Sequence, residues 1–257
     1  MRRAPGPQGG GRLPLAVASA DSNGLIRAPS DWRNADMAPA AQKTSSNAVT
    51  IDVWSDVMCP FCWMGETLLQ QAAEASGHEL DIRYHSYQLM PHLPADSAVN
   101  VNDLLERERG FPREQALAMN RQVAARAAQV GLVYNMDDAI ATNTRSAHRL
   151  AHFAKQRGKQ HELMQQLFKA YLTDGLNIGD HEVLADLAAE VGLDRAAALE
   201  ALKTDAFAAE FDADVEEARR LGISGVPFFV LNGKYAVSGA QPREVFEQAL
   251  AKASAEV

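Results

Sequence analysis

The chain has 257 residues, a formal net charge of −8 and 47% hydrophobic residues, enough for a substantial core. It contains no run of about 18 apolar residues, so no membrane-spanning helix is expected. Six of the 25 basic and three of the 33 acidic residues lie before position 49, which leaves residues 49–257 with a formal charge of −11. Nucleic-acid binding relies on Lys and Arg at phosphates. We therefore expect neither nucleic acid nor membrane as a partner.

Residues 1–48 differ in composition from the rest of the chain. They hold five of the eleven prolines and a run of three glycines, and no periodicity persists in them. Such a composition favours a disordered extension. Two early arginines followed by LPLAVASA match a secretory signal poorly, because the apolar core is shorter than the usual stretch of about 7–15 residues. A weak signal peptide and a true start at Met37 stay open as alternatives, and we expect a cytoplasmic protein.

The first predicted elements surround the only two cysteines of the chain. Val49, Ile51 and Val53 alternate with other residues and predict a strand. The sequence Cys59-Pro60-Phe61-Cys62 follows, and then a helical run that Gly77 is expected to end. A second alternating run, from Leu80 to about Ser86, predicts another strand.

A Cys-x-x-Cys pair between a strand and a helix is typical of a thiol–disulfide redox site. If a helix begins at Cys59, free backbone N–H groups and the positive end of the helix dipole face its sulfur. The pKa of that thiol is then expected to fall from about 8.5 into a range of about 3.5–7.5. Cys62 lies one turn further along, within reach of Cys59. Pro60 suits the first turn, because the N–H that it lacks would have no partner there.

Two other uses of the cysteine pair stay open. A structural zinc ion needs four ligands, and the chain has no second Cys pair. Histidines such as His148 and His152, which are spaced to share one face of a helix, would have to complete the site. A structural disulfide between Cys59 and Cys62 would close so short a loop that it would constrain the unfolded chain little. We therefore expect a redox pair and no bound metal.

A long helical stretch is expected over residues 100–222. Apolar residues at helical spacing, interrupted by glycines at positions 131, 158 and 192, predict its helices. We interpret the Met and aromatic stripes as core faces. In the last helix of this stretch, the residues expected on the core face are Phe207, Phe211, Val215 and Ala218. The residues expected at helix starts are Pro112, Asn143 or Thr144, Asp180 and Asp194.

Strand character returns in the last part of the chain. The segment from Val226 to Leu231 is β-branched and aromatic, and Asn232-Gly233 indicates a two-residue hairpin turn before a return strand at Lys234–Val237. Pro242 opens a terminal helix. A proline within a strand is confined to edges and irregular positions. A cis peptide bond between Val226 and Pro227 would explain this one, although trans is the commoner form.

Together these residues resemble those of a thioredoxin-fold oxidoreductase of the DsbA superfamily, and most of all its FrnE-like branch. That branch is related to kappa-class glutathione transferases and 2-hydroxychromene-2-carboxylate isomerases. The resemblance covers about residues 49–252, and its motifs are SDVMCPFCW from Ser55, Asn143-Thr144 with AHRL from Ala147, and GVPFFV from Gly225. It implies an α/β, thioredoxin-like fold with a large inserted all-helical region. Residues 49–99 and 223–257 would form the two halves of the thioredoxin-like domain, and residues 100–222 the insertion.

The resemblance also implies roles for individual residues. Cys59 would attack a disulfide, Cys62 would resolve the mixed disulfide, and a cis-proline at Pro227 would face them. An extended substrate would pair with the backbone of Val226. The other residues implied at the substrate are Pro60 and Phe61, with Asn143 at the border of a groove. The implied partners are protein or small-molecule thiols and disulfides, with no cofactor beyond the redox disulfide and with glutathione as a candidate co-substrate. The oligomeric state stays open, a homodimer included.

A glutathione-dependent transferase or isomerase is the alternative function. Relatives with that activity use a single Ser or Cys, whereas this chain has Cys59 in place of the isomerase serine and retains Cys62. A zinc-binding or chaperone-like module is a third option. Phe61 offers a Cys59 thiolate neither charge nor hydrogen bond, unlike the His of strongly oxidising members, so we expect a weaker oxidant. We interpret Asp56 as a loop or capping acid, Trp63 as packing beneath the site, and His148 as non-catalytic.

Overall fold

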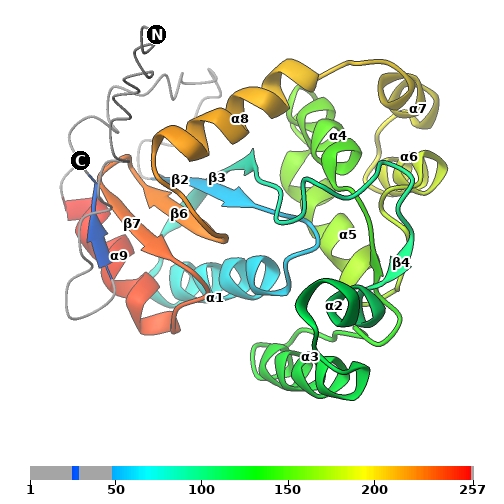
Figure 1. Ribbon diagram of the computed structural model, residues 1–257. Helices are drawn as coiled ribbons and strands as arrows, with labels where there is room; N and C mark the ends of the chain where they lie inside the picture. The colour runs from blue at the N-terminus through cyan, green and yellow to red at the C-terminus, as the bar shows by residue number, and fades with distance from the viewer. Residues whose placement is uncertain (1–24, 29–47, 256–257) are drawn as a thin grey trace, which may run out of the picture.

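The computed structural model describes residues 25–28 and 48–255. At its centre lies a mixed sheet of five strands: β1 (Leu25–Arg27), β2 (Ala48–Ser55), β3 (Glu79–Ser86), β6 (Phe228–Leu231) and β7 (Tyr235–Ser238). Their order is β1-β7-β6-β2-β3, and only β2 and β3 run parallel (Figure 1). The predicted thioredoxin-like arrangement is confirmed, because the two halves of the sheet flank a helical insertion.

The strand β1 was not predicted from the sequence. Leu25 pairs with Val237 and Arg27 with Tyr235, so β1 extends the edge of the sheet at β7. The expected disorder of residues 1–48 is therefore wrong for residues 25–28, while the signal-peptide and Met37 alternatives lie outside the described residues. Three residues are too few to show the alternation of a strand. Their structure depends on a pairing partner at the far end of the chain.

Different helices cover the two faces of the sheet. α1 (Pro60–Ser76) and α9 (Arg243–Ala255) pack together on one face, against Ile51 and Val53 (Figure 1). α8 (Ala208–Arg220) lies on the other face, where Trp54 packs with Ala218 and Phe228. Successive side chains of a strand point to opposite faces. β2 is therefore buried on both sides, and it carries the chain directly into α1.

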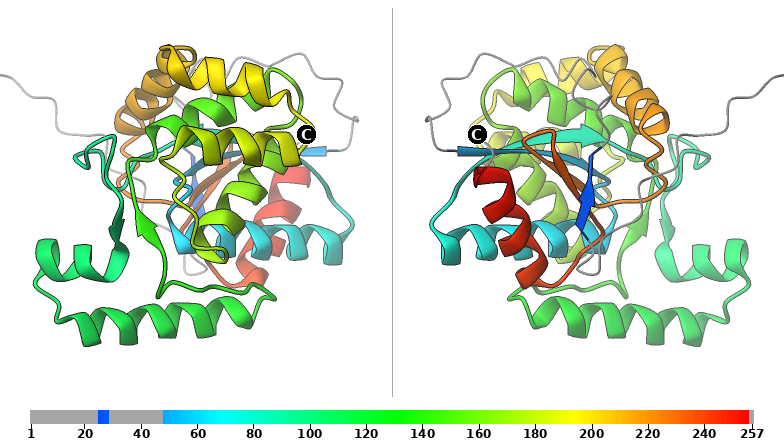
Figure 2. Two further views of the ribbon diagram at one scale, coloured as in Figure 1. Left: turned by 90° about the vertical axis from the view of Figure 1, so that its right-hand side faces the viewer. Right: turned by 90° about the vertical axis from the view of Figure 1, so that its left-hand side faces the viewer.

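The insertion between β3 and β6 also contains a short ladder of β4 (Val99–Asn100) and β5 (Ile140–Ala141), which the periodicity did not indicate. Its other helices are α2 (Val101–Arg109), α3 (Arg113–Ala128), α4 (Arg145–Lys155), α5 (Gln160–Leu172), α6 (His181–Glu190) and α7 (Arg195–Lys203). Figure 2 shows α2 and α3 projecting from the body. Within the described ranges, no helix is long and apolar enough to cross a membrane.

Several predicted boundaries are confirmed. Asp180 and Asp194 cap α6 and α7 by accepting backbone N–H hydrogen bonds. The turn predicted at Asn232 and Gly233 is present, with φ of 49° and 63° and a hydrogen bond of 2.9 Å from Lys234 N to the Leu231 carbonyl. Leu231 pairs with Tyr235, however, so three residues join the strands, and the return strand begins at Tyr235 rather than at the predicted Lys234. The expected burial of Val215 in α8 is wrong, because this side chain is 37% exposed. Asp214 occupies the buried position beside it, where it binds two histidines.

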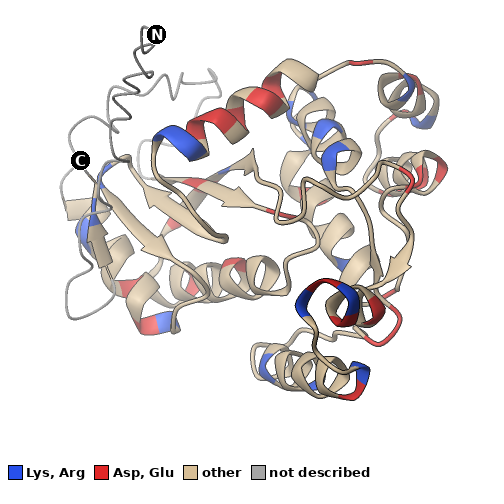
Figure 3. Cartoon of the chain, in the orientation of Figure 1, with Lys and Arg blue, Asp and Glu red and all other residues tan. Residues whose placement is uncertain are grey.

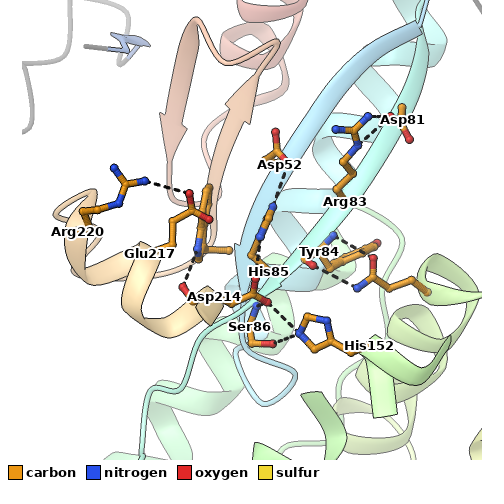
Figure 4. A network of polar contacts seen from close by, with 12 residues as sticks. Asp52, Asp81, Arg83, Tyr84, His85, Ser86, His152, Asp214, Glu217 and Arg220 are labelled. Atoms are coloured by element: carbon orange, nitrogen blue, oxygen red, sulfur yellow. Dashed lines mark hydrogen bonds and ion pairs between the residues drawn. The ribbon is translucent and has the colours of Figure 1, made fainter. Parts of the chain in front are cut away.

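A buried polar network joins the sheet to the insertion (Figure 4). The ring of His85, on β3, lies between the carboxylates of Asp52 on β2 and Asp214 on α8, at 3.0 Å from each. His152 of α4 lies 3.0 Å from the other oxygen of Asp214 and 3.1 Å from the Ser86 hydroxyl. Burial opposes a charge on His85, but the hydrogen bonds to both carboxylates outweigh it and raise its pKa to about 9. Hydrogen bonds from the two histidines likewise overcome burial and hold the pKa of Asp214 well below its usual range.

Candidate active site

The two cysteines lie where the chain passes from β2 into α1. The carbonyl of Asp56 accepts a hydrogen bond from Cys59 N at 2.9 Å, and the carbonyl of Cys59 accepts one from Cys62 N at 3.0 Å. Cys59 occupies the N-cap position with an extended backbone, and Pro60 takes the first turn, as predicted. The N–H groups that the first turn leaves unpaired are therefore close to Cys59.

The segment Val226–Pro227 faces the thiols from the second half of the sheet. Its peptide bond is cis, and Cys59 Sγ lies 3.7 Å from the carbonyl oxygen of Val226. Gly65 permits this approach, because a Cβ at that position would lie 3.1 Å from Pro227 Cγ and 3.3 Å from Ala240 Cα. Gly65 was not among the predicted site residues, because nothing in the local sequence marks a helical glycine as a contact point.

The two thiols are reduced and chemically unequal. Cys59 is 3% and Cys62 2% exposed. Burial raises the pKa of the Cys62 thiol well above its usual range, and a hydrogen bond to the Cys59 sulfur and repulsion from its charge raise it further. Cys62 therefore keeps its proton more firmly than an ordinary thiol. This inequality suits an attacking sulfur at position 59 and a resolving sulfur at position 62.

The insertion supports the cysteine turn through Tyr134, which no sequence motif pointed to. Its hydroxyl donates a hydrogen bond of 2.7 Å to the carbonyl of Pro60, and its ring stacks on Trp63 with centroids 5.7 Å apart. Trp63 in turn stacks on the buried Phe168 of α5, so it packs beneath the site as predicted. Burial, together with the charges of Cys59 and Cys62, raises the pKa of Tyr134, which keeps the phenol a donor.

Asp56 organises the loop before Cys59. Its buried carboxylate accepts hydrogen bonds from the backbone N–H of Leu89 at 2.7 Å and of Met58 at 3.4 Å. His148 lies against it, with Nε2 3.4 Å from Asp56 Oδ1. The predicted loop role of Asp56 is confirmed, and His148 is a buried histidine of the core.

Asn143 lies just before α4, in the loop that precedes it. Its amide donates to the carbonyl of Leu93 at 2.6 Å and accepts from Gln88 at 2.9 Å and from Arg145 N at 3.0 Å. These bonds account for the residue as an acceptor for the first N–H of α4, whose N-cap is Thr144, and as a tether of the neighbouring loop. Its role at a substrate groove stays a prediction. Among the residues described, no group of three or more His, Cys, Asp and Glu side chains is arranged to hold a metal ion.

A buried carboxyl group lies one helical turn beyond Cys62. Glu66 is 2% exposed, and burial raises its pKa to about 7 although three donors oppose the shift. Those donors are the Tyr84 hydroxyl, Gln70 Nε2 at 3.2 Å and Gln165 Nε2 at 2.6 Å. Gln165 also accepts from Trp63 Nε1 at 2.9 Å, which connects this group to the cysteine turn.

Glu66→Gln is expected to stabilise the protein at alkaline pH. A carboxyl with a pKa of about 7 when folded and about 4.3 when unfolded binds more protons in the folded state, so stability falls as pH rises between these values. The variant avoids this loss, and its free energy of unfolding at pH 8.5 is expected to exceed that of the wild type by up to about 4 kcal/mol. At pH 4 the two are expected to agree. Urea denaturation at both pH values measures this, with the exposed Glu74→Gln on α1 as control; an equal gain at pH 4 would contradict it.

The fold and the paired thiols place this protein in the class of thioredoxin-like thiol–disulfide oxidoreductases. Residues 50–251 match the model of the DSBA-like thioredoxin domain. The chain belongs to this family.

Known relatives share both sequence and structure with the chain. A probable DsbA oxidoreductase from Streptomyces coelicolor is 37% identical with a TM-score of 0.77, and the match covers 81% of this chain and 91% of that one. The uncharacterized protein YwbO of Bacillus subtilis is 30% identical over 204 residues, which are 79% of this chain and 96% of YwbO. The cytosolic disulfide reductase DsbM from Pseudomonas aeruginosa is 21% identical with a TM-score of 0.54, covers 79% of this chain and 98% of its own, and shares the fold.

Proposed function

We propose that this protein exchanges a dithiol and a disulfide between Cys59–Cys62 and protein or small-molecule thiols, as an enzyme of the FrnE-like branch. Family membership supports the reaction class, and the SDVMCPFCW and GVPFFV motifs support the branch. One observation carries the assignment of roles. Both thiols are buried, but the raised pKa belongs to Cys62, and Cys59 is the sulfur that contacts the Val226 carbonyl.

The reaction follows from this difference between the thiols. The Cys59 thiolate attacks one sulfur of a substrate disulfide, and the other substrate sulfur leaves with the electron pair and takes up a proton. The charge on Cys59 is then gone, and with it two of the three causes that raise the pKa of Cys62. Cys62 therefore loses its proton more readily and attacks Cys59 Sγ. The Cys59–Cys62 disulfide forms, and the second substrate sulfur leaves as a thiol. In reverse, the oxidised pair donates its disulfide.

We assign the substrate to the half-buried residues around Cys59. An extended segment would pair with the backbone of Val226, whose carbonyl already points at the reacting sulfur. Pro60 and Phe61 are also half-buried, and the buried Pro227 lies against Gly65 of the same helix. Glutathione is the proposed small-molecule co-substrate. A glutathione transferase would need a single nucleophile, so the retained Cys62, one helical turn from Cys59, favours disulfide exchange.

The direct test is thiol-dependent reduction of insulin. The wild type is expected to accelerate it, and the variant with both Cys59→Ser and Cys62→Ser is expected to be inactive. Equal rates for the two proteins would contradict the proposal. Circular dichroism checks that the double variant is folded, since both side chains lie in the core.

The redox potential gives a second expectation. Because Phe61 supplies neither charge nor hydrogen bond to a Cys59 thiolate, the reduced form lacks the stabilisation that makes a strong oxidant. Equilibration with glutathione buffers is expected to give a potential more negative than the value of about −120 mV of the strongest oxidants in this class. A potential as high as about −120 mV would contradict the argument from Phe61 and leave the exchange reaction standing.

A further inference from the structure

The turn that carries the thiols has no charged side chain of its own. Residues 57–65 are uncharged, and Asp56 and Glu66, which flank them, are buried. Figure 3 shows the first turns of α1 without either charge colour, while α3 carries basic segments. A cation reaches the turn from this helix. The Arg126 guanidinium carbon lies 5.8 Å from the centroid of the Phe61 ring.

Arg126 bridges the two loops that flank Cys59. Phe61 stands between the cysteines, and Arg126 Nη2 also donates a hydrogen bond of 3.2 Å to the carbonyl of Ala240. Ala240 follows Gly239, whose N–H donates to the Pro227 carbonyl at 2.8 Å. The guanidinium therefore touches the cysteine loop and the loop beside Pro227, and these loops meet at the contact between Cys59 and Val226.

The charge of Arg126 is exposed and, within residues 25–28 and 48–255, not neutralised by an ion pair. Arg121 on the same helix differs, since it pairs with Asp137 at 3.6 Å. A guanidinium carries five N–H donors in a planar fork that matches a carboxylate, and the Ala240 carbonyl uses one of them. Residues 49–257 carry a formal charge of −11, so an anionic ligand needs a local cation in order to approach.

We propose that Arg126 is a specificity-determining residue that binds a carboxylate of the thiol or disulfide substrate, and that it selects small acidic thiols of the glutathione class. The inference rests on the proposed exchange at Cys59. A short cysteine-containing peptide holds its carboxylates a few bonds from the sulfur. It can therefore reach Cys59 and a guanidinium at Phe61 together.

The test compares two disulfides that differ in charge. Stopped-flow measurements give the rate constant for oxidation of the reduced protein by glutathione disulfide, which is anionic, and by bis(2-hydroxyethyl) disulfide, which is neutral. Arg126→Gln is expected to slow the first reaction about tenfold, the effect of one lost charge-assisted hydrogen bond, and to leave the second unchanged. Arg126→Lys keeps the charge but lacks the planar fork of N–H donors. Its rate constant with glutathione disulfide is expected to lie between those of the wild type and Arg126→Gln. Added salt is expected to reduce the preference of the wild type for the anion.

Arg121→Gln is the matched control, because it removes the same charge from the same helix away from Phe61. It is expected to leave both rate constants unchanged. Equal slowing of both disulfides by Arg126→Gln would show that the side chain only braces the loops, and no slowing of either would also overturn the proposal. If the wild type reacts with neither disulfide, the proposed exchange itself fails, which is a separate outcome.

Discussion

Cys62→Ser is expected to stop turnover and to accumulate a covalent complex with the substrate. Cys59 keeps its place at the start of α1 and beside the Val226 carbonyl, so the first attack remains available. The sulfur that would release the substrate is missing, and the mixed disulfide persists. Insulin reduction is expected to fall by about three orders of magnitude or more, as when a catalytic nucleophile is removed. Mass spectrometry of the trapped complexes measures the adduct and identifies the substrate.

Cys59→Ser is the matched control, and it is expected to lose turnover to the same extent without trapping anything. Burial raises the pKa of the remaining Cys62 thiol, and Cys59, not Cys62, is the sulfur in contact with the Val226 carbonyl, so Cys62 is a poor nucleophile toward an external disulfide. Adducts of equal abundance in both variants would refute the separate roles of the two sulfurs. If Cys62→Ser retained full turnover with glutathione and an aromatic substrate, the transferase alternative would replace the exchange reaction.

The residues whose roles could be predicted from the sequence are those that their immediate neighbours in the sequence suffice to identify. A Cys-x-x-Cys pair after an alternating run defines a redox turn wherever it occurs, and Asn232-Gly233 defines a hairpin by its positive φ values. Pro227 stood out because proline is unusual in a strand. Both halves of the fold were predictable for this reason.

The residues that sequence missed act through contacts between distant segments. Tyr134 is one aromatic residue in a loop, and only the folded insertion brings its hydroxyl to Pro60. The need for a glycine at position 65 comes from its contact with Pro227, and β1 is a strand because it pairs with β7 at the edge of the sheet. Asp214, and not Val215, occupies the buried position in α8. The spacing of apolar residues could not predict this, because it gives no indication of a buried carboxylate that binds two histidines. The helical insertion is therefore part of the site rather than an addition to a finished domain.

The same coupling between sheet and insertion leads to the largest expected effect on stability. His85→Ala is expected to lower the free energy of unfolding by about 3–5 kcal/mol near pH 6, because it leaves Asp52 buried without its cationic partner and removes one of two histidines from Asp214. His92→Ala is the matched control. His92 pairs with Glu108 at 2.9 Å, but its side chain is 58% exposed, so a loss of less than about 1 kcal/mol is expected.

The pH dependence separates the charge of His85 from its packing on Trp54, where the ring centroids lie 4.5 Å apart. The pKa of His85 is about 9 when folded and about 6.5 when unfolded, so the folded state binds more protons between these values. Its contribution is complete below pH 6.5 and is lost as pH rises through 9, a fall of about 3 kcal/mol in the wild type. Urea denaturation from pH 6 to 9.5 is expected to show a fall in the wild type and in His92→Ala that exceeds the fall in His85→Ala by about 3 kcal/mol. The smaller fall that remains in His85→Ala belongs to Glu66, whose pKa in the folded protein is about 7. A parallel fall in all three proteins would mean that His85 serves the core through packing alone.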